Sequence, residues 1–125
     1  MMQAPLIAPR ATWTPPDLNA LPSWANAKRV GIDTETRDPF LKTLGPGVRR
    51  GGNSYIVGIS FALEDGPGGY LPIAHAGGGN LPKELVLKYL HDQAAVFTGD
   101  IVGANLPYDL DWLAQYGIVF RKARF

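Results

Sequence analysis

Residues 55–63 (YIVGISFAL) carry the sequence feature that most restricts the possible folds. Large apolar side chains recur there at every second position, which is the period of a β-strand with one buried face. They are Val57, Ile59, Phe61 and Leu63. The alternate positions hold small side chains, which would let a neighbouring element pack closely on the other face. They are Gly58, Ser60 and Ala62.

A second strand is predicted at residues 70–74 (YLPIA), after a turn rich in Gly and Pro at residues 64–69. The short turn makes the two strands a hairpin. Because proline cannot donate a hydrogen bond to a ladder, Pro72 favours an edge position or a bulge for this strand.

The rest of the pattern alternates between helix and strand. A first strand is predicted at residues 28–34, and a helix begins near Asn80, which can cap it. The helix carries an apolar stripe at Leu85, Val86, Tyr89 and Leu90. Further elements are predicted as a strand at 100–104, a helix at 106–116 ended by Gly117, and a strand beginning at 118–120. This order predicts an α/β fold, with a mixed β-sheet and flanking helices, that is compatible with a ribonuclease H-like architecture.

Two segments lie outside these elements. Residues 1–27 are rich in Pro and Ala and are predicted to be a leader or linker, in which Asp17 caps a short helical turn through Trp24. Residues 37–53 form a loop in which Asp38 is the only acid. Its basic residues are Arg37, Lys42, Arg49 and Arg50. Contact with DNA phosphates and an ordinary solvated surface both explain such a loop.

Composition excludes several classes of protein. The chain has no cysteine, so it has no disulfide and no cysteine-based zinc site, and a cytosolic location is expected. A formal net charge of +1 neither requires nor excludes a nucleic-acid partner. The sequence shows no signal peptide and no apolar run long enough to span a membrane.

Three carboxylates stand where they could bind metal. Asp33 and Glu35, in GIDTET, share one face of the first strand. Asp109, in NLPYD, lies in the first turn of the last helix, directly after a strand that can pair with the first one. Carboxylate oxygens suit Mg²⁺ and Mn²⁺, and two ions held about 3.5–4 Å apart need at least three such acids. Taken singly, the same residues could also be a polar strand end and an ordinary helix acid.

These two motifs resemble the first and second exonuclease motifs of the DEDD superfamily, as found in polymerase I-like (family A), phage-type DNA polymerases. The resemblance covers residues 28–125, which would then form a partial 3′→5′ exonuclease domain. It implies two divalent cations, Mg²⁺ or Mn²⁺, bound by Asp33, Glu35 and Asp109. It also implies proofreading, in which the 3′-terminal phosphodiester of single-stranded DNA is hydrolysed to release a nucleoside monophosphate. The implied substrate-contacting residues are Thr34, Thr36, Phe40, Asn105 and Tyr108.

The resemblance has a further consequence and leaves two alternatives. The third motif of the family, with its fourth carboxylate and a tyrosine, has no counterpart here, so the domain is expected to be C-terminally incomplete and joined to a polymerase domain. A bacterial or phage-infected bacterial cytosol is the implied location. A non-catalytic nucleic-acid-binding or scaffold remnant of the same fold and a ribonuclease D-like RNA exonuclease remain open. For His75 a structural role is predicted, and for His91 an exposed position.

Overall fold

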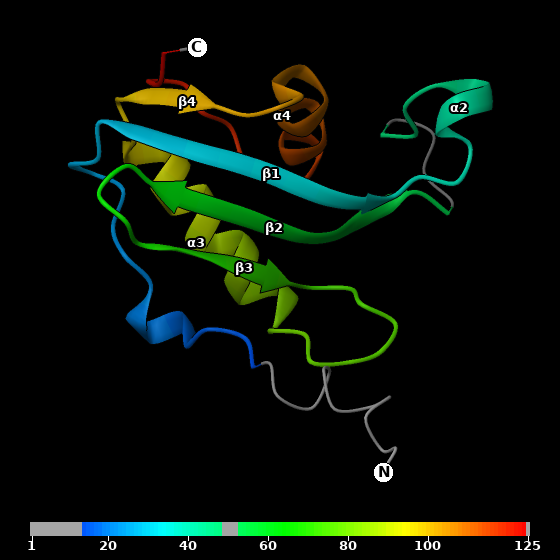
Figure 1. The fold of residues 1–125 in the computed structure, drawn as a ribbon, viewed down its shortest axis with the longest axis horizontal. Helices are drawn as coiled ribbons and strands as arrows, with labels where there is room; N and C mark the ends of the chain where they lie inside the picture. Colours follow the sequence, from blue (N-terminus) through cyan, green and yellow to red (C-terminus); the bar gives the residue numbers. More distant parts are fainter. Residues whose placement is uncertain (1–13, 49–52, 125) are drawn as a thin grey trace, which may run out of the picture.

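The computed structural model describes residues 14–48 and 53–124, and its centre is a four-stranded sheet in the order β3-β2-β1-β4 (Figure 1). The strands are β1 (Arg29–Arg37), β2 (Tyr55–Leu63), β3 (Gly68–Pro72) and β4 (Asp100–Val102). β1 pairs antiparallel with β2 and parallel with β4, while β2 and β3 form the predicted hairpin. The sheet is therefore mixed, and β3, which ends at Pro72, lies at its edge. These features confirm the predicted α/β class and its compatibility with a ribonuclease H-like fold.

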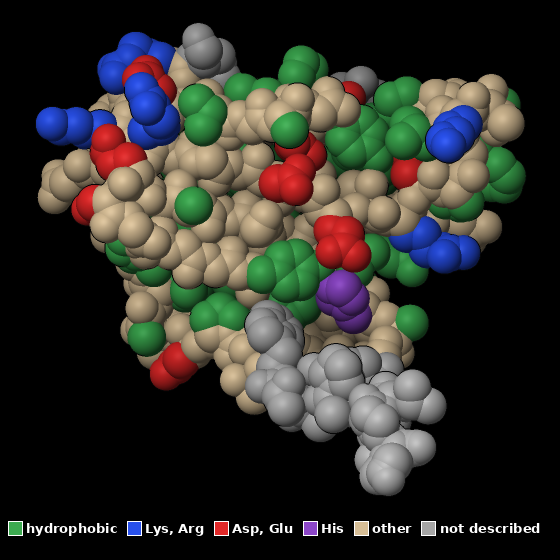
Figure 2. Space-filling view, viewed as in Figure 1, with side chains coloured by type: hydrophobic (Ala, Val, Ile, Leu, Met, Phe, Trp, Pro, Cys, Tyr) green, Lys and Arg blue, Asp and Glu red, His purple; other side chains and the backbone are tan. Residues whose placement is uncertain are grey.

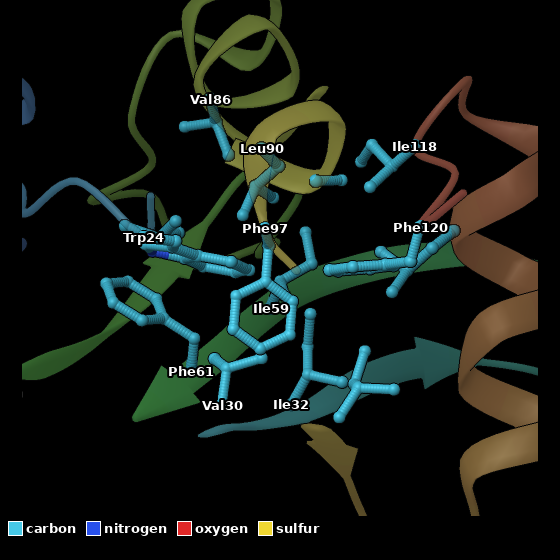
Figure 3. Close-up of a cluster of buried hydrophobic side chains, with 14 of the residues drawn as sticks. Trp24, Val30, Ile32, Ile59, Phe61, Val86, Leu90, Phe97, Ile118 and Phe120 are labelled. Carbon is cyan, nitrogen blue, oxygen red and sulfur yellow. The ribbon is translucent and has the colours of Figure 1, made fainter. Parts of the chain in front are cut away.

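Two helices pack on one face of the sheet. They are α3 (Lys83–Val96) and α4 (Leu106–Gln115), and their buried residues belong to the same core as those of β1 and β2. Figure 3 shows this core, with Val86 and Leu90 of α3 directed toward Ile32 and Ile59 of the sheet. No helix in the described part of the chain crosses the other face of the sheet, which is turned toward the viewer in Figure 1.

A bulge shifts the register of the central hairpin. Glu35 pairs with Gly58, but the next residue, Thr36, pairs with Ile56, so Val57 is the extra residue of β2. Ile56 consequently enters the core at 1% exposure, and Val57 is only half-buried. The strict alternation predicted for Val57 was therefore wrong at this one position.

Several other boundaries differ from the prediction. β3 covers Gly68–Pro72 instead of 70–74, β4 ends at Val102, and α3 begins at Lys83 with Pro82, not Asn80, as its N-cap. β1 continues to Arg37, so Glu35 lies inside the strand, and the loop after it contains a short helix, α2 (Leu41–Leu44). The predicted strand does not begin at 118–120: Gly117, with φ of 84°, ends α4, and the chain pairs with β4 only later, where Arg124 forms a parallel bridge with Asp100. Ile118 and Phe120 are buried in the core instead of pairing in the sheet.

The segment before β1 contributes to the core. Asp17 caps a 3₁₀ turn, η2 (Leu18–Ala20), by accepting a hydrogen bond from the backbone N–H of Asn19. The turn is shorter than predicted and stops before Trp24, which is completely buried. Trp24 and Trp112 are both core residues, whereas Trp13 lies outside the described residues. Among the described helices, none is long and apolar enough to cross a membrane.

Candidate functional site

The uncovered face of the sheet carries the acidic residues of the first motif. Asp33 and Glu35 alternate along β1 with Ile32 and Thr34, so they point away from the core and are exposed. Figure 2 shows acidic side chains and a histidine gathered near the middle of this face, with basic side chains toward its two ends. The face thus presents negative charge over its central strand.

Asp109 approaches the same strand from the first turn of α4. Its side chain is 2% exposed. One oxygen, Oδ1, accepts hydrogen bonds from the Thr34 backbone N–H at 3.2 Å and from the Thr34 hydroxyl at 2.5 Å. The other, Oδ2, is buried with no hydrogen-bond partner. Thr34 therefore fixes the orientation of Asp109 and leaves one carboxylate oxygen available.

The electrostatics of Asp109 follow from this position. Burial raises the pKa of the carboxyl group, and the negative charge of Asp33 raises it further, while the two hydrogen bonds from Thr34 act in the opposite direction. Asp33 and Asp109 are thus close enough to interact. Among the described residues, however, no three acidic or histidine side chains converge into a ready-made metal cluster.

Glu35 is held by a different set of contacts. Its Oε1 accepts a hydrogen bond of 3.0 Å from the hydroxyl of Tyr70 on β3. The same hydroxyl lies 2.5 Å from Nε2 of His75. The structural role predicted for His75 agrees with this contact. Tyr70 itself was not predicted as a site residue, because its partner lies two strands away in the sheet.

Thr36 of β1 and Tyr108 of α4 contact each other through their hydroxyl groups. Their hydroxyl oxygens are 2.8 Å apart, and the Tyr108 hydroxyl also donates to Oδ2 of Asp38 at 3.1 Å. Because the Tyr108 proton is directed to Asp38, the Thr36 hydroxyl is the donor to Tyr108. Asp38 also accepts hydrogen bonds from the backbone N–H of Gly47 and from the Ser54 hydroxyl, at 2.9 and 3.1 Å.

Through these hydrogen bonds, Asp38 connects both ends of the loop after β1 to Tyr108 of α4. This role was missed by sequence reasoning, although Asp38 had been recognised as the only acid of a basic loop. Of the basic residues in that loop, Lys42 is exposed, and Arg49 and Arg50 lie outside the described residues.

A pocket of about 520 Å³ opens between this loop and α4. Its lining is formed by Thr36, Leu41, Pro46, Val48, Asn105, Pro107, Tyr108 and Asp111. Three predicted substrate-contacting residues thus lie around one cavity. Asn105 is the N-cap residue of α4, but its side chain makes no capping hydrogen bond. Phe40 is 49% exposed and does not line the pocket, whereas its neighbour Leu41 does.

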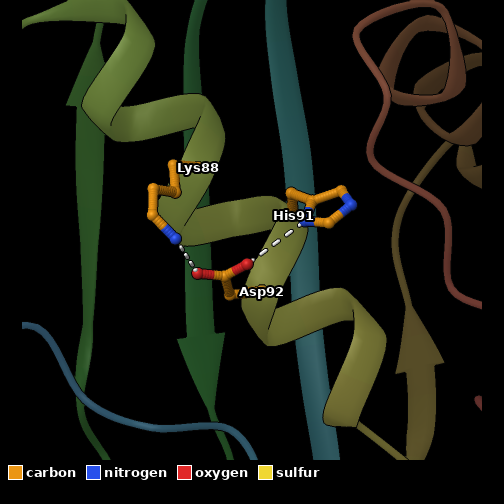
Figure 4. Close-up of polar contacts among 3 residues, drawn as sticks. All are labelled: Lys88, His91 and Asp92. Atoms are coloured by element: carbon orange, nitrogen blue, oxygen red, sulfur yellow. Dashed lines mark hydrogen bonds and ion pairs between the residues drawn. The ribbon is translucent and has the colours of Figure 1, made fainter.

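The second histidine lies in a different environment. His91 is exposed on α3, where Asp92 accepts hydrogen bonds from it and from Lys88, as Figure 4 shows. The pKa of Asp92 is lowered by these contacts, first by the bond from Lys88. This solvent-exposed trio confirms the predicted exposure of His91, and it belongs to the helical side of the sheet.

Comparison with known proteins shows a similarity to a phage polymerase. No protein-family model matches the chain. A DNA-directed DNA polymerase of Pseudomonas phage M6 is 66% identical to it over 125 residues, which cover 99% of this chain and 19% of the polymerase. The chain spans less than a fifth of the length of this relative. The chain is therefore related in sequence to one part of a phage DNA polymerase.

Proposed function

We propose that this chain is the front part of a proofreading 3′→5′ exonuclease domain. The single observation that carries the proposal is the environment of Asp109. Its Oδ2 is buried without a partner while Asp33 stands close by. An unpaired buried carboxylate oxygen next to a second carboxylate is costly in an ordinary protein interior, but a bound cation would relieve that cost.

The donor set suits a divalent cation. Asp33, Glu35 and Asp109 offer only carboxylate oxygens, which Mg²⁺ and Mn²⁺ prefer. We propose that these three residues bind two such ions. When bound, the ions would neutralise charge that develops on the phosphate during hydrolysis.

The protein's own groups have separate tasks in this proposal. Thr34 orients Asp109 through two hydrogen bonds. The pocket between the loop after β1 and α4 would receive the terminal nucleotide, with the Tyr108 ring and Leu41 offering apolar contact. Because the Tyr108 hydroxyl donates to Asp38, its ring and not its proton faces the substrate in this scheme. Asn105, whose side chain makes no capping bond, has an amide to offer to the nucleotide.

The relative supports the wider setting of the proposal. That relative is a DNA-directed DNA polymerase, and this chain corresponds to 19% of its length. We accordingly propose that the chain works with a covalently linked polymerase domain, and that its substrate is the 3′ end of single-stranded DNA.

The test is degradation of a 5′-labelled single-stranded DNA oligonucleotide with Mn²⁺, for the wild-type chain and Asp33→Asn. We expect stepwise shortening from the 3′ end that requires Mn²⁺ and falls by at least 100-fold in the variant. The matched control is Asp65→Asn, an exposed acid in the β2–β3 turn, which should leave the activity unchanged.

A parallel titration with Mn²⁺ makes the test independent of turnover. If the wild-type chain and Asp33→Asn bind Mn²⁺ equally and neither degrades DNA, the proposal is wrong. DNA binding that needs neither Mn²⁺ nor Asp33 would then favour the non-catalytic alternative. Faster degradation of an RNA oligonucleotide of the same sequence would instead favour the ribonuclease D-like alternative.

A further inference from the structure

Glu35 differs from the other two carboxylates because a side chain of β3, two strands away in the sheet, holds it by a hydrogen bond. Asp109 is buried and fixed by Thr34, whereas Glu35 is exposed on the open face of the sheet. A glutamate has several rotatable bonds, so an exposed one loses considerable conformational entropy when it is held in one position. The hydrogen bond from the Tyr70 hydroxyl to Oε1 restrains it.

Gly58 provides the space for this contact. It lies on β2 between the two partners and is the register neighbour of Glu35 on one side and of Pro72 on the other. Any β-carbon at Gly58 would overlap the hydroxyl and ring of Tyr70. The absence of a side chain at this position therefore allows Tyr70 to cross β2 and reach β1.

A second layer holds Tyr70 in place. Its hydroxyl donates to Glu35, so His75 must be the donor in the 2.5 Å contact between Nε2 and the hydroxyl. The backbone N–H of His75 donates to Oδ1 of Asn80, and the amide of Asn80 donates back to the His75 carbonyl. The chain of contacts thus runs from Asn80 through His75 and Tyr70 to Glu35.

We propose that Tyr70 is a positioning residue that sets the Glu35 carboxylate in the orientation needed to bind a divalent cation. This inference rests on the proposed function. Residues that orient a metal ligand through a hydrogen bond typically change metal affinity by about 10–100-fold when they are removed.

The experiment compares Mn²⁺ binding to the full chain for the wild type, Tyr70→Phe and Tyr89→Phe. Tyr70→Phe removes only the hydroxyl, and we expect about a tenfold weaker Mn²⁺ affinity. Tyr89→Phe is the matched control, because its hydroxyl contacts Pro22 and Trp24 on the helical side of the sheet. It should bind Mn²⁺ as the wild type does, even where its thermal stability is lower.

Two further readouts separate positioning from a general structural effect. The Mn²⁺ concentration that gives half-maximal exonuclease activity should rise about tenfold in Tyr70→Phe, while the KM for the oligonucleotide stays unchanged. Gly58→Ala, which keeps the hydroxyl but displaces the Tyr70 ring, should produce the same defect in Mn²⁺ affinity.

The outcomes distinguish this inference from the proposed function. Unchanged Mn²⁺ affinity in Tyr70→Phe, together with weakened affinity in Asp33→Asn, would overturn the role of Tyr70 alone. Unchanged affinity in both variants would overturn the proposed function and this inference together.

Discussion

At the scale of single residues, the burial of the Asp109 carboxylate at the candidate site is unfavourable for folding. One oxygen of its carboxylate is satisfied by Thr34, and the other is buried without a partner. Without a bound cation, ionised Asp109 should therefore destabilise the folded chain. Such a local loss of stability is common where a protein binds a charged ligand.

We predict that Asp109→Asn stabilises the chain in EDTA by about 1 kcal/mol at neutral pH. The pKa of Asp109 is raised above its ordinary 3.8, so the folded state binds more protons than the unfolded state just above that pH. Stability of the wild type therefore falls as pH rises through this window. In thermal melts, Asp109→Asn should raise the stability of the folded chain more at pH 7.5 than at pH 4.5. A loss of stability at both pH values would contradict the prediction, and Asp65→Asn is the control.

At the scale of elements, periodic patterns predicted most of the sheet and both main helices. Residues 55–63 alternate clearly, and β2 has the predicted limits. The local sequence does not indicate the bulge at Val57, because the extra residue is defined only by the pairing of β2 with β1. The strand expected at 118–120 is absent for a similar reason. Ile118 and Phe120 are apolar enough for a strand, but their side chains are buried in the core beside α4. The motifs identify the candidate carboxylates, whose metal binding stays a prediction, while the roles of Asp38 and Tyr70 depend on contacts between distant segments.

One contact between elements makes a pH-dependent prediction. The Tyr89 hydroxyl on α3 donates to the Pro22 carbonyl at 2.6 Å and accepts from the Trp24 indole N–H at 3.0 Å. Burial raises the pKa of Tyr89 to about 12, from 10.0. Its contribution to stability is therefore complete below pH 10 and is lost as pH rises toward 12.

We expect Tyr89→Phe to cost about 1–2 kcal/mol at pH 8, because the carbonyl of Pro22 and the indole of Trp24 both lose a partner. Urea unfolding at pH 8 and pH 11 measures the difference. The difference in unfolding free energy between wild type and variant should be smaller at pH 11 than at pH 8. A larger difference at pH 11 would show that another group controls the alkaline loss of stability.

At the scale of the whole molecule, Trp24 joins parts of the chain that are far apart in sequence. Its ring lies 5.2 Å from that of Phe61 on β2 and 6.3 Å from that of Phe97 after α3. It also stacks on Phe120 near the end of the chain, with centroids 6.1 Å apart. Its backbone N–H donates to Gln93. The segment before β1, predicted as a leader or linker, thus supplies a central core residue.

We predict that Trp24→Ala costs about 3–5 kcal/mol, the usual range for deleting a large buried aromatic side chain. Since small domains have only about 5–15 kcal/mol of stability, this loss would leave much of the chain near its unfolding threshold. A chain that begins at Lys28 lacks the same side chain and should show an equal or larger fall in its urea midpoint. Trp24→Phe keeps part of the ring contacts, so its urea midpoint should lie between those of the wild type and Trp24→Ala. If the chain beginning at Lys28 instead kept the wild-type urea midpoint, the domain would begin at residue 28 and Trp24 would only cover a core that is complete without it.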